Sequence, residues 1–415
     1  MVIIYFFIAL LIFFIFFEWP FFGLSIMVVM IPGEELTTLS GGRTLIWIFG
    51  VILLIAWTVR TLFTKKKIEG ELKQSIIAII FLLWCFISIF WTVDQKAALE
   101  RGIIIAQLIV FFFLIQTLVI NENKFKSILF LYYFSSIIIA LISIYLTLYL
   151  NLSRAAITED QNPNSLARVL GIALLMGIFI YKNINYKSKK MLFIFFQCLL
   201  IFAIFLTGSR GSWLSLLAAF CFTWVLVGKK LIKLRAVILI ALIAFISIII
   251  VNELSKKDVI NIEIINRLTS MFDIEATHGG AGRINIWAVG WEIIKENPFI
   301  GVGLEGFTHV FHYYIYRANL FDTHGIYPGR DPHNIFLSIQ AELGLVGSLL
   351  FLIFLIKFFL RLIKARYDLR AILGLLLLSF MVFSGIVEPV LYRKYFWLSL
   401  GLIAAIQKLI SQDEM

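Results

Sequence analysis

Residues 103–120, IIIAQLIVFFFLIQTLVI, decide the class of fold, because they form a long run without a charged side chain. A run of about 20 apolar residues crosses the roughly 30 Å hydrocarbon core of a bilayer as an α-helix. Lipid offers no partner to backbone N–H and C=O groups, so only helices and closed barrels can cross it. The apolar residues are continuous and do not alternate with polar ones. We therefore expect residues 103–120 to form a transmembrane helix.

Similar runs recur along the 415-residue chain, which is 61% hydrophobic and has a mean hydropathy of +0.98. This composition excludes the two or three soluble domains that the length alone would allow. The sequence predicts an all-α polytopic membrane protein with about twelve transmembrane helices and one large extracytoplasmic loop that contains short helices. The other predicted spans are 1–32 (interrupted near Glu18-Trp19-Pro20), 44–63, 76–92, 127–150, 165–181, 191–207, 212–227, 236–251, 335–356, 371–389 and 395–410. Counting 1–32 as two crossings would give thirteen helices and an external start.

Basic residues set the expected orientation, because cytoplasmic loops carry an excess of Lys and Arg. The basic clusters fall on alternate connections, so they lie on one side of the predicted bundle and leave both termini in the cytoplasm. The net charge of +11 is dispersed over these short loops, so a nucleic-acid partner is not expected. The clusters are Lys65–Lys67, Lys124 with Lys126, Lys182–Lys190, Lys229–Arg235 and Lys357–Arg370.

The interval 252–334 is the one long polar stretch, and it contains all five histidines. It falls on the side opposite the basic clusters. The predicted organisation is therefore transmembrane helices 1–9 over residues 1–251, a large extracytoplasmic loop over 252–334, and transmembrane helices 10–12 with a short cytoplasmic tail over 335–415. We expect a multi-pass protein of the cytoplasmic membrane with chemistry at its outer face.

Two arginines are candidate anion ligands. Arg210 lies in the short external turn Thr207-Gly-Ser-Arg210-Gly-Ser-Trp213, where glycines allow a tight turn and arginine offers a planar fork of donors. Arg283 follows a Gly-rich turn and opens an amphipathic stretch, and a helix N-terminus of this kind favours anions. The structural alternatives are an arginine that extends to the interface for Arg210, and a surface arginine over a packed helix for Arg283.

His333 is the candidate general base. Asp331-Pro332-His333-Asn334 has the pattern of the N-cap and first turn of the helix that re-enters the membrane. A neutral imidazole at that position could accept a proton from a sugar hydroxyl. The alternative is a capping-region histidine that bonds backbone or water. Glu342 points almost oppositely to His333 on this helix, so we interpret it as structural.

Glu305, His309 and His312 are spaced i, i+4, i+7 and could present metal ligands on one helical face. Nearby glycines and aromatic residues make a regular helix doubtful there, so ordinary surface histidines are the default and no metal is expected. The aromatic residues of the loop are expected to pack it into a compact cap.

Four motifs, in this order, resemble the O-antigen ligase and polymerase family of bacterial surface-polysaccharide assembly over roughly residues 150–350. They are Arg154 with Asn162-Pro163-Asn164; Thr207–Trp213; Gly282-Arg283 leading to Trp287 and Pro298-Phe-Ile-Gly-Val-Gly-Leu-Glu-Gly-Phe307; and His333-Asn334 leading to Ala341-Glu-Leu-Gly-Leu-Val-Gly347.

The resemblance implies metal-independent, inverting glycosyl transfer without a cofactor, from a glycan on undecaprenyl pyrophosphate to an acceptor hydroxyl. In this family the residues matching Arg210 and Arg283 bind pyrophosphate, and the one matching His333 orients or deprotonates the acceptor. Arg154 is a further expected donor contact. The implied partners are the lipid-linked oligosaccharide donor, a glycan or lipid acceptor, the bilayer and other polysaccharide-assembly membrane proteins.

Several functions stay open at this point. A polymerase uses a second lipid-linked glycan as acceptor, whereas a ligase uses lipid A core or a protein. A chain rich in Ile, Phe, Lys and Asn indicates an AT-rich genome, and many such hosts lack an outer membrane, which favours polymerase slightly. A flippase or transporter would need ionisable groups along a path through the bilayer, and the predicted spans contain few. A non-catalytic scaffold would not need His333 and both arginines together.

Overall fold

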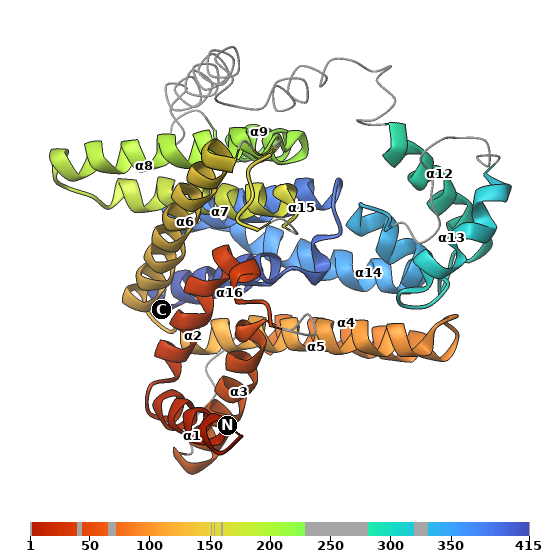
Figure 1. The fold of residues 1–415 in the computed structure, drawn as a ribbon, viewed down its shortest axis with the longest axis horizontal. Helices are drawn as coiled ribbons and strands as arrows, with labels where there is room; N and C mark the ends of the chain where they lie inside the picture. The colour runs from red at the N-terminus through yellow and green to blue at the C-terminus, as the bar shows by residue number, and fades with distance from the viewer. Residues whose placement is uncertain are drawn as a thin grey trace.

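The regular elements of the protein are all helices in the part of the chain that the computed structural model describes, residues 2–39, 44–64, 72–150, 152, 154–158, 161–228, 281–318 and 331–414 (Figure 1). The predicted span 236–251, and loop residues such as His278 and His324, lie outside these ranges. The helices are α1 Val2–Glu18, α2 Pro20–Met30, η1 Ile31–Thr37, α3 Leu45–Thr64, α4 Leu72–Ile87, η2 Ser88–Phe90, α5 Gln95–Leu118, α6 Glu122–Leu150, α7 Pro163–Lys182, α8 Lys187–Leu206, α9 Arg210–Val227, α12 Ala281–Glu296, α13 Gly306–Arg317, α14 Ile335–Lys364, α15 Leu369–Gly385, η3 Val390–Tyr392 and α16 Lys394–Asp413.

Eight helices in the described ranges are long and apolar enough to cross a membrane, and three shorter apolar helices accompany them. Large apolar side chains such as Phe63 and Leu217 are exposed on the outside of the bundle. Exposed apolar surface of this extent suits a lipid environment and is unusual in a soluble monomer. The prediction of an all-α, multi-pass membrane protein is confirmed at this level, and the count of twelve crossings stays a prediction.

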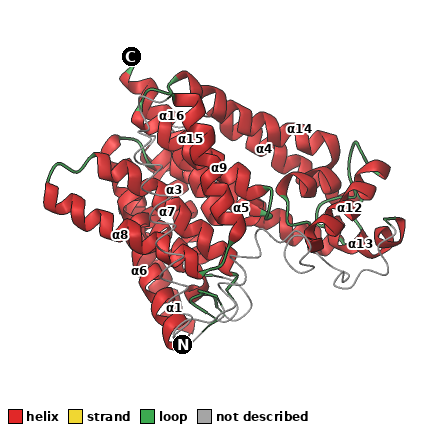
Figure 2. Cartoon of the chain, turned by 90° about the horizontal axis from the view of Figure 1, so that it is seen from above, coloured by secondary structure: helices red, strands yellow, loops and turns green. Residues whose placement is uncertain are grey.

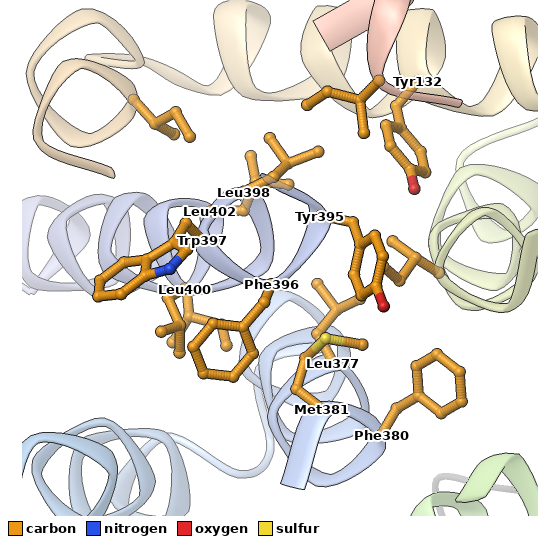
Figure 3. Packing of buried hydrophobic residues seen from close by; sticks show 14 of the residues in the cluster. Tyr132, Leu377, Phe380, Met381, Tyr395, Phe396, Trp397, Leu398, Leu400 and Leu402 are labelled. Carbon is orange, nitrogen blue, oxygen red and sulfur yellow. The ribbon is translucent and has the colours of Figure 1, made fainter. Parts of the chain in front are cut away.

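Helix α16 lies in the centre of the bundle, and its residues 395–410 are buried except for the half-buried Lys408. Phe396 and Trp397 contact each other edge to face, with ring centroids 5.7 Å apart. Figure 3 shows the Phe396 ring on the side of α16 that faces Leu377 and Met381 of α15. The Trp397 indole N–H donates to the Leu391 carbonyl at 2.7 Å, so this large side chain is buried with its polar atom satisfied.

Helices α12 and α13 pack together and form the cap, which comprises the described loop residues 281–318. Figures 1 and 2 both show the two helices at one end of the molecule, near the ends of α4, α5 and α14. Their apolar residues form a cluster separate from that of the bundle, including Val289 and Ile293 of α12 and Phe307 and Phe311 of α13. The expectation that aromatic residues pack the loop is confirmed for this cluster.

The cap is bound to α14 at a break in that helix. Gly344 has φ 65° and ψ −164°, which splits α14 into two helical segments. The Leu345 and Val346 N–H groups donate to the carbonyls of Pro298 and Phe299 at 2.9 and 3.3 Å. In return, the Val302 and Gly303 N–H groups donate to the carbonyls of Ala341 and Glu342 at 2.9 and 2.8 Å.

The break is compatible with a membrane protein because these backbone groups find partners in the cap. A helix of 30 residues is about 45 Å long, well above the thickness of the hydrocarbon core. The segment after Gly344 is long enough to cross by itself. The segment before it, residues 335–343, can therefore lie at a membrane surface and carry the chain from His333 into the bundle.

Two glycines make this close approach possible. A Cβ on Gly301 would lie 2.4 Å from the Glu342 backbone carbonyl, and a Cβ on Gly344 would lie 2.3 Å from that of Phe299. Both residues also have positive φ, which side chains disfavour. The two backbones therefore pack directly against each other, without side chains between them.

We expect Gly301→Ala to lower the stability of the folded protein more than Gly228→Ala. Both glycines have positive φ, but a Cβ on Gly228 would meet nothing within 4 Å. The steric clash at Gly301 should add about 1–3 kcal/mol of destabilisation to the φ cost that both variants share. Thermal unfolding of the two variants in detergent measures the difference, and equal losses would show that the contact with α14 does not limit this position.

Candidate functional site

The first two motifs are in direct contact. The Arg154 guanidinium donates from Nε to the Thr207 carbonyl at 2.7 Å and from Nη2 to the Asn164 side-chain oxygen at 2.8 Å. The Ala155 N–H donates to the Leu206 carbonyl at 2.8 Å. Arg154 therefore joins the turn that contains Arg210 to the start of α7.

Arg210 is the first residue of α9, directly after a tight turn. Gly208 has φ 60°, a conformation that favours glycine, and Ser209 is the N-cap. A Cβ on Gly211 would lie 2.9 Å from Val387, so the turn packs against the connection between α15 and α16. The predicted short turn is confirmed, and Arg210 is half-buried at a helix N-terminus.

Arg283 lies in the first turn of α12, as predicted from the Gly-rich stretch before it. Burial lowers the pKa of its guanidinium, Glu388 opposes this shift, and the positive charges of Arg168 and Arg210 lower the pKa further. Arg283 and Arg210 therefore lie within electrostatic range of each other, although they are far apart in the sequence. We call Arg168, Arg210, Arg283 and Glu388 the cationic cluster.

Two members of the cationic cluster, Arg168 and Glu388, were not predicted from the sequence. Arg168 Nη2 lies 3.4 Å from Glu388 Oε2, and the two side chains are only 1% and 3% exposed. The Arg168 Nε and Nη1 atoms have no hydrogen-bond partner among the described residues. An arginine inside the apolar run 165–181 is a signal for function in itself, since charged residues in membrane segments are costly.

His333 occupies a different position from the predicted one. The N-cap of α14 is Asn334, whose side-chain oxygen accepts from the Phe336 and Leu337 N–H groups, and not Asp331. Asn and Asp are both strong N-caps, and Asn334 lies closer to the apolar run. His333 therefore precedes the helix, with φ 48°, and the helical-face comparison that separated it from Glu342 does not apply.

The imidazole of His333 is held close to the other site residues. Its Nδ1 atom is buried and has no hydrogen-bond partner in the described part of the chain. The Trp287 indole N–H donates to the Pro332 carbonyl at 3.1 Å, and Trp287 lies one turn after Arg283 on α12. Because of this bond, α12 carries Arg283 and also supports the segment that presents His333.

Asp331 lies within electrostatic range of Glu388 from the cationic cluster and of Glu305. Burial raises the pKa of its carboxyl; His333 and Arg101 lower it, and Glu305 and Glu388 raise it.

The backbone of His333 is strained, because its positive φ of 48° costs a non-glycine residue about 1–3 kcal/mol. Strain of this size persists where the surrounding structure imposes it, as the Trp287 bond and the Asn334 cap do here.

Arg101 is the cation beside the acidic residues Glu305 and Glu342, which are electrostatic neighbours of each other and of Asp331. Arg101 binds Glu305 through two hydrogen bonds of 2.7 and 2.9 Å and stacks over the Tyr392 ring at 4.4 Å. Glu342 is only 5% exposed, and its electrostatic neighbours are Glu305, Asp331 and Arg101. Sequence reasoning missed Arg101, which lies near the start of α5.

The metal-ligand hypothesis is not supported by the geometry. Helix α13 begins at Gly306, so Glu305 precedes it with φ 59° and is bound to Arg101. His309 Nε2 lies 3.9 Å from an oxygen of Asp94. No group of three His, Cys, Asp or Glu residues that could hold a metal ion occurs within the described ranges.

The arrangement brings three arginines together, and α12 links them to the segment of the half-buried His333. Residues 195–352 match the O-Antigen ligase family. The match covers the second, third and fourth motifs, and the Arg154 motif lies before it. The resemblance to the O-antigen ligase and polymerase family is thereby confirmed, and it supports an enzymatic role in polysaccharide biosynthesis at a membrane. No curated protein matches the chain. The individual roles of Arg154, Arg210, Arg283 and His333 stay predictions.

We expect Glu388→Ala to destabilise the protein by about 3–5 kcal/mol, because Arg168 would then be buried without a counter-charge. Thermal unfolding in detergent measures the loss. The double variant Arg168→Met, Glu388→Leu should recover most of it, since a well-packed apolar pair can replace a buried ion pair. Glu292→Ala, which removes an exposed pair with Lys295, is the control and should have little effect. Equal stability of Glu388→Ala and wild type would contradict the prediction.

We expect Asp331→Asn to stabilise the protein at pH 7. Because the pKa of Asp331 is raised in the folded state, the protonated form is favoured there, and its contribution to stability is lost as the pH rises above 3.8 and through the folded pKa. The variant avoids this loss, so its advantage in melting temperature should vanish towards pH 4. A variant less stable than wild type at pH 7 would show that the His333 and Arg101 charges outweigh the burial of the carboxylate.

Proposed function

We propose that the protein transfers a glycan from undecaprenyl pyrophosphate to a hydroxyl of a second lipid-linked glycan, as a polymerase at the outer face of the cytoplasmic membrane. The observation that carries the proposal is the cationic cluster beside His333. Twelve crossings, with residues 252–334 as an extracytoplasmic loop between the segments 1–251 and 335–415, would place this site at the level of the outer headgroups.

The cationic cluster has the charge for a pyrophosphate. Three arginines and one glutamate give +3 and −1, a net charge of +2. Arg210 and Arg283 also lie in the first turns of α9 and α12, where the helix dipoles favour anions. Charge-assisted hydrogen bonds contribute about 1.5–3 kcal/mol each, and their effect on rate is greatest where the leaving pyrophosphate gains charge.

Arg154 would contact the lipid-linked glycan donor, as predicted from the sequence. Its hydrogen bonds to Thr207 and Asn164 give it a second role, which is to hold the Arg210 turn against α7. Loss of Arg154 would then weaken donor binding through the position of Arg210 as well as through its own charge.

His333 would act on the acceptor. The acceptor oxygen attacks the anomeric carbon from the side opposite the leaving group, the bond from that carbon to the pyrophosphate oxygen breaks, and the hydroxyl proton passes to the imidazole. The nearby Asp331 carboxylate stabilises the imidazolium that forms. General-base assistance of this kind contributes about 10²–10⁴ in rate. No metal or cofactor enters these steps, and the bond formed inverts the anomeric configuration.

A ligase is the alternative within the same chemistry, because the matched family is described as O-Antigen ligase. It would transfer the same glycan to lipid A core or to a protein. Synthesis of polymer in membranes that hold only lipid-linked repeat units, without lipid A, would identify a polymerase. Other membrane proteins of polysaccharide assembly are proposed partners in both cases. A flippase would instead leave the units on the cytoplasmic leaflet when the protein is lost.

Complementation of a null strain with His333→Ala, Arg210→Ala and Arg283→Ala tests the proposal. Each variant should accumulate single lipid-linked units at near-normal protein level, and His333→Ala should slow polymerisation at least about 100-fold. Arg317→Ala is the matched control, because Arg317 is an exposed arginine of the same cap that pairs with Glu296. Full-length polymer from all three variants would contradict the catalytic assignment.

A further inference from the structure

A cavity of about 1040 Å³ lies at the break between α1 and α2, away from the candidate active site. The break was expected near Glu18-Trp19-Pro20, and it occurs there: α1 ends at Glu18 and α2 begins at Pro20. The walls are formed by the end of α1, the start of α2, the end of α3, and the residues around the connection between α5 and α6.

The cavity lies at the opposite end of α5 from the candidate site. Arg101, which binds Glu305, is near the start of α5, and Leu118, which lines the cavity, is its last residue. At 1.5 Å per residue these two positions are about 25 Å apart along the helix. If the site lies at the outer face of the membrane, the cavity lies at the level of the cytoplasmic leaflet.

The lining combines apolar and aromatic walls with two cations. Trp19 and Phe22 are 64% and 52% exposed, and Trp57 forms part of the opposite wall. Tryptophan concentrates at the membrane–water interface, where its ring meets both phases. Arg60 and Lys124 line the same space, with Glu18 as the acidic residue among the lining side chains. The two cations outnumber the carboxylate.

The two cations are placed by their own contacts. Arg60 Nη1 donates to the carbonyls of Phe17 and Glu18, which are among the carbonyls that the end of α1 leaves without helical partners. A guanidinium has five N–H donors, so Arg60 can hold this helix end and still donate to an oxygen in the cavity. The Lys124 ammonium lies 5.0 Å from the centroid of the Phe21 ring, at the start of α2.

We propose that this cavity binds one anionic phospholipid of the cytoplasmic leaflet, with its phosphate between Arg60 and Lys124 and an acyl chain along Trp19, Phe22 and Trp57. Basic pockets between transmembrane helices on the cytoplasmic side have this specificity for anionic headgroups. The bound lipid fills the space that the α1–α2 break opens, and it joins the first two helices to α3 and α6. The proposal does not depend on glycosyl transfer.

The test is titration of the detergent-solubilised full chain with phosphatidylglycerol or phosphatidylcholine of the same acyl chains, followed by native mass spectrometry. We expect one phosphatidylglycerol per chain, bound at least about tenfold more tightly than phosphatidylcholine. Each basic residue near an anionic surface contributes about a factor of five, so Arg60→Ala with Lys124→Ala should weaken phosphatidylglycerol about 25-fold and abolish the preference. Equal binding of the two lipids, or a preference that survives the double variant, overturns the proposal.

Three controls make the result specific. Lys126→Ala removes a lysine two residues along α6 that pairs with Glu122 and does not line the cavity, so it should leave the preference unchanged. Lys124→Ala alone removes no helix cap, and it should weaken phosphatidylglycerol about fivefold even if the double variant does not fold. Undecaprenyl phosphate at equal concentration should not displace phosphatidylglycerol; complete displacement would assign the cavity to the polyprenyl carrier and overturn the proposal.

Discussion

The backbone contact between the Pro298–Gly303 segment and the break in α14 is the interaction on which the position of the cap depends. A bilayer protein cannot leave a helix broken unless the freed N–H and C=O groups find partners. Here the cap supplies those partners, and the bundle supplies the partners of the cap in return. Trp84, in the last turn of α4, and Thr92, in the α4–α5 connection, donate to the neighbouring carbonyls of Leu343 and Leu304. The position of the cap is therefore fixed by hydrogen bonds that also complete the membrane helix.

The electrostatics of the site follow from this fixed position. Burial lowers the pKa of Arg283 most, Glu388 offsets part of this shift, and the charges of Arg168 and Arg210 lower the pKa further. An anion that enters the cluster relieves the repulsion between the arginines. The arginines do not need to move to bind the anion, because α9 and α12 already hold Arg210 and Arg283 in place. Asp331 is within electrostatic range of His333, of Glu388 from this cluster and of Glu305.

Much of the fold could be predicted from the sequence, because apolar runs and basic clusters are local signals. The turn before Arg210, the start of α12 and the break at Trp19 were likewise visible in glycine and proline placement. The position of His333 was not, since Asp331 and Asn334 are both good N-caps and only packing decides between them. Arg101 and Glu388 were missed because they lie far from the motifs, and Arg168, four residues after Asn164, was missed because it lies inside an apolar run. Their importance appears only when α5, α7 and the α15–α16 connection come together.

The contact of Gly301 with Glu342 and of Gly344 with Phe299 also constrains how such a chain can change over generations. Each glycine meets the backbone of the other segment, so enlarging one residue cannot be compensated by trimming a side chain opposite. A substitution at either position requires a shift of the other main chain, which several simultaneous changes would have to accommodate. We therefore expect the two glycines, separated in sequence by the loop, to be constrained together.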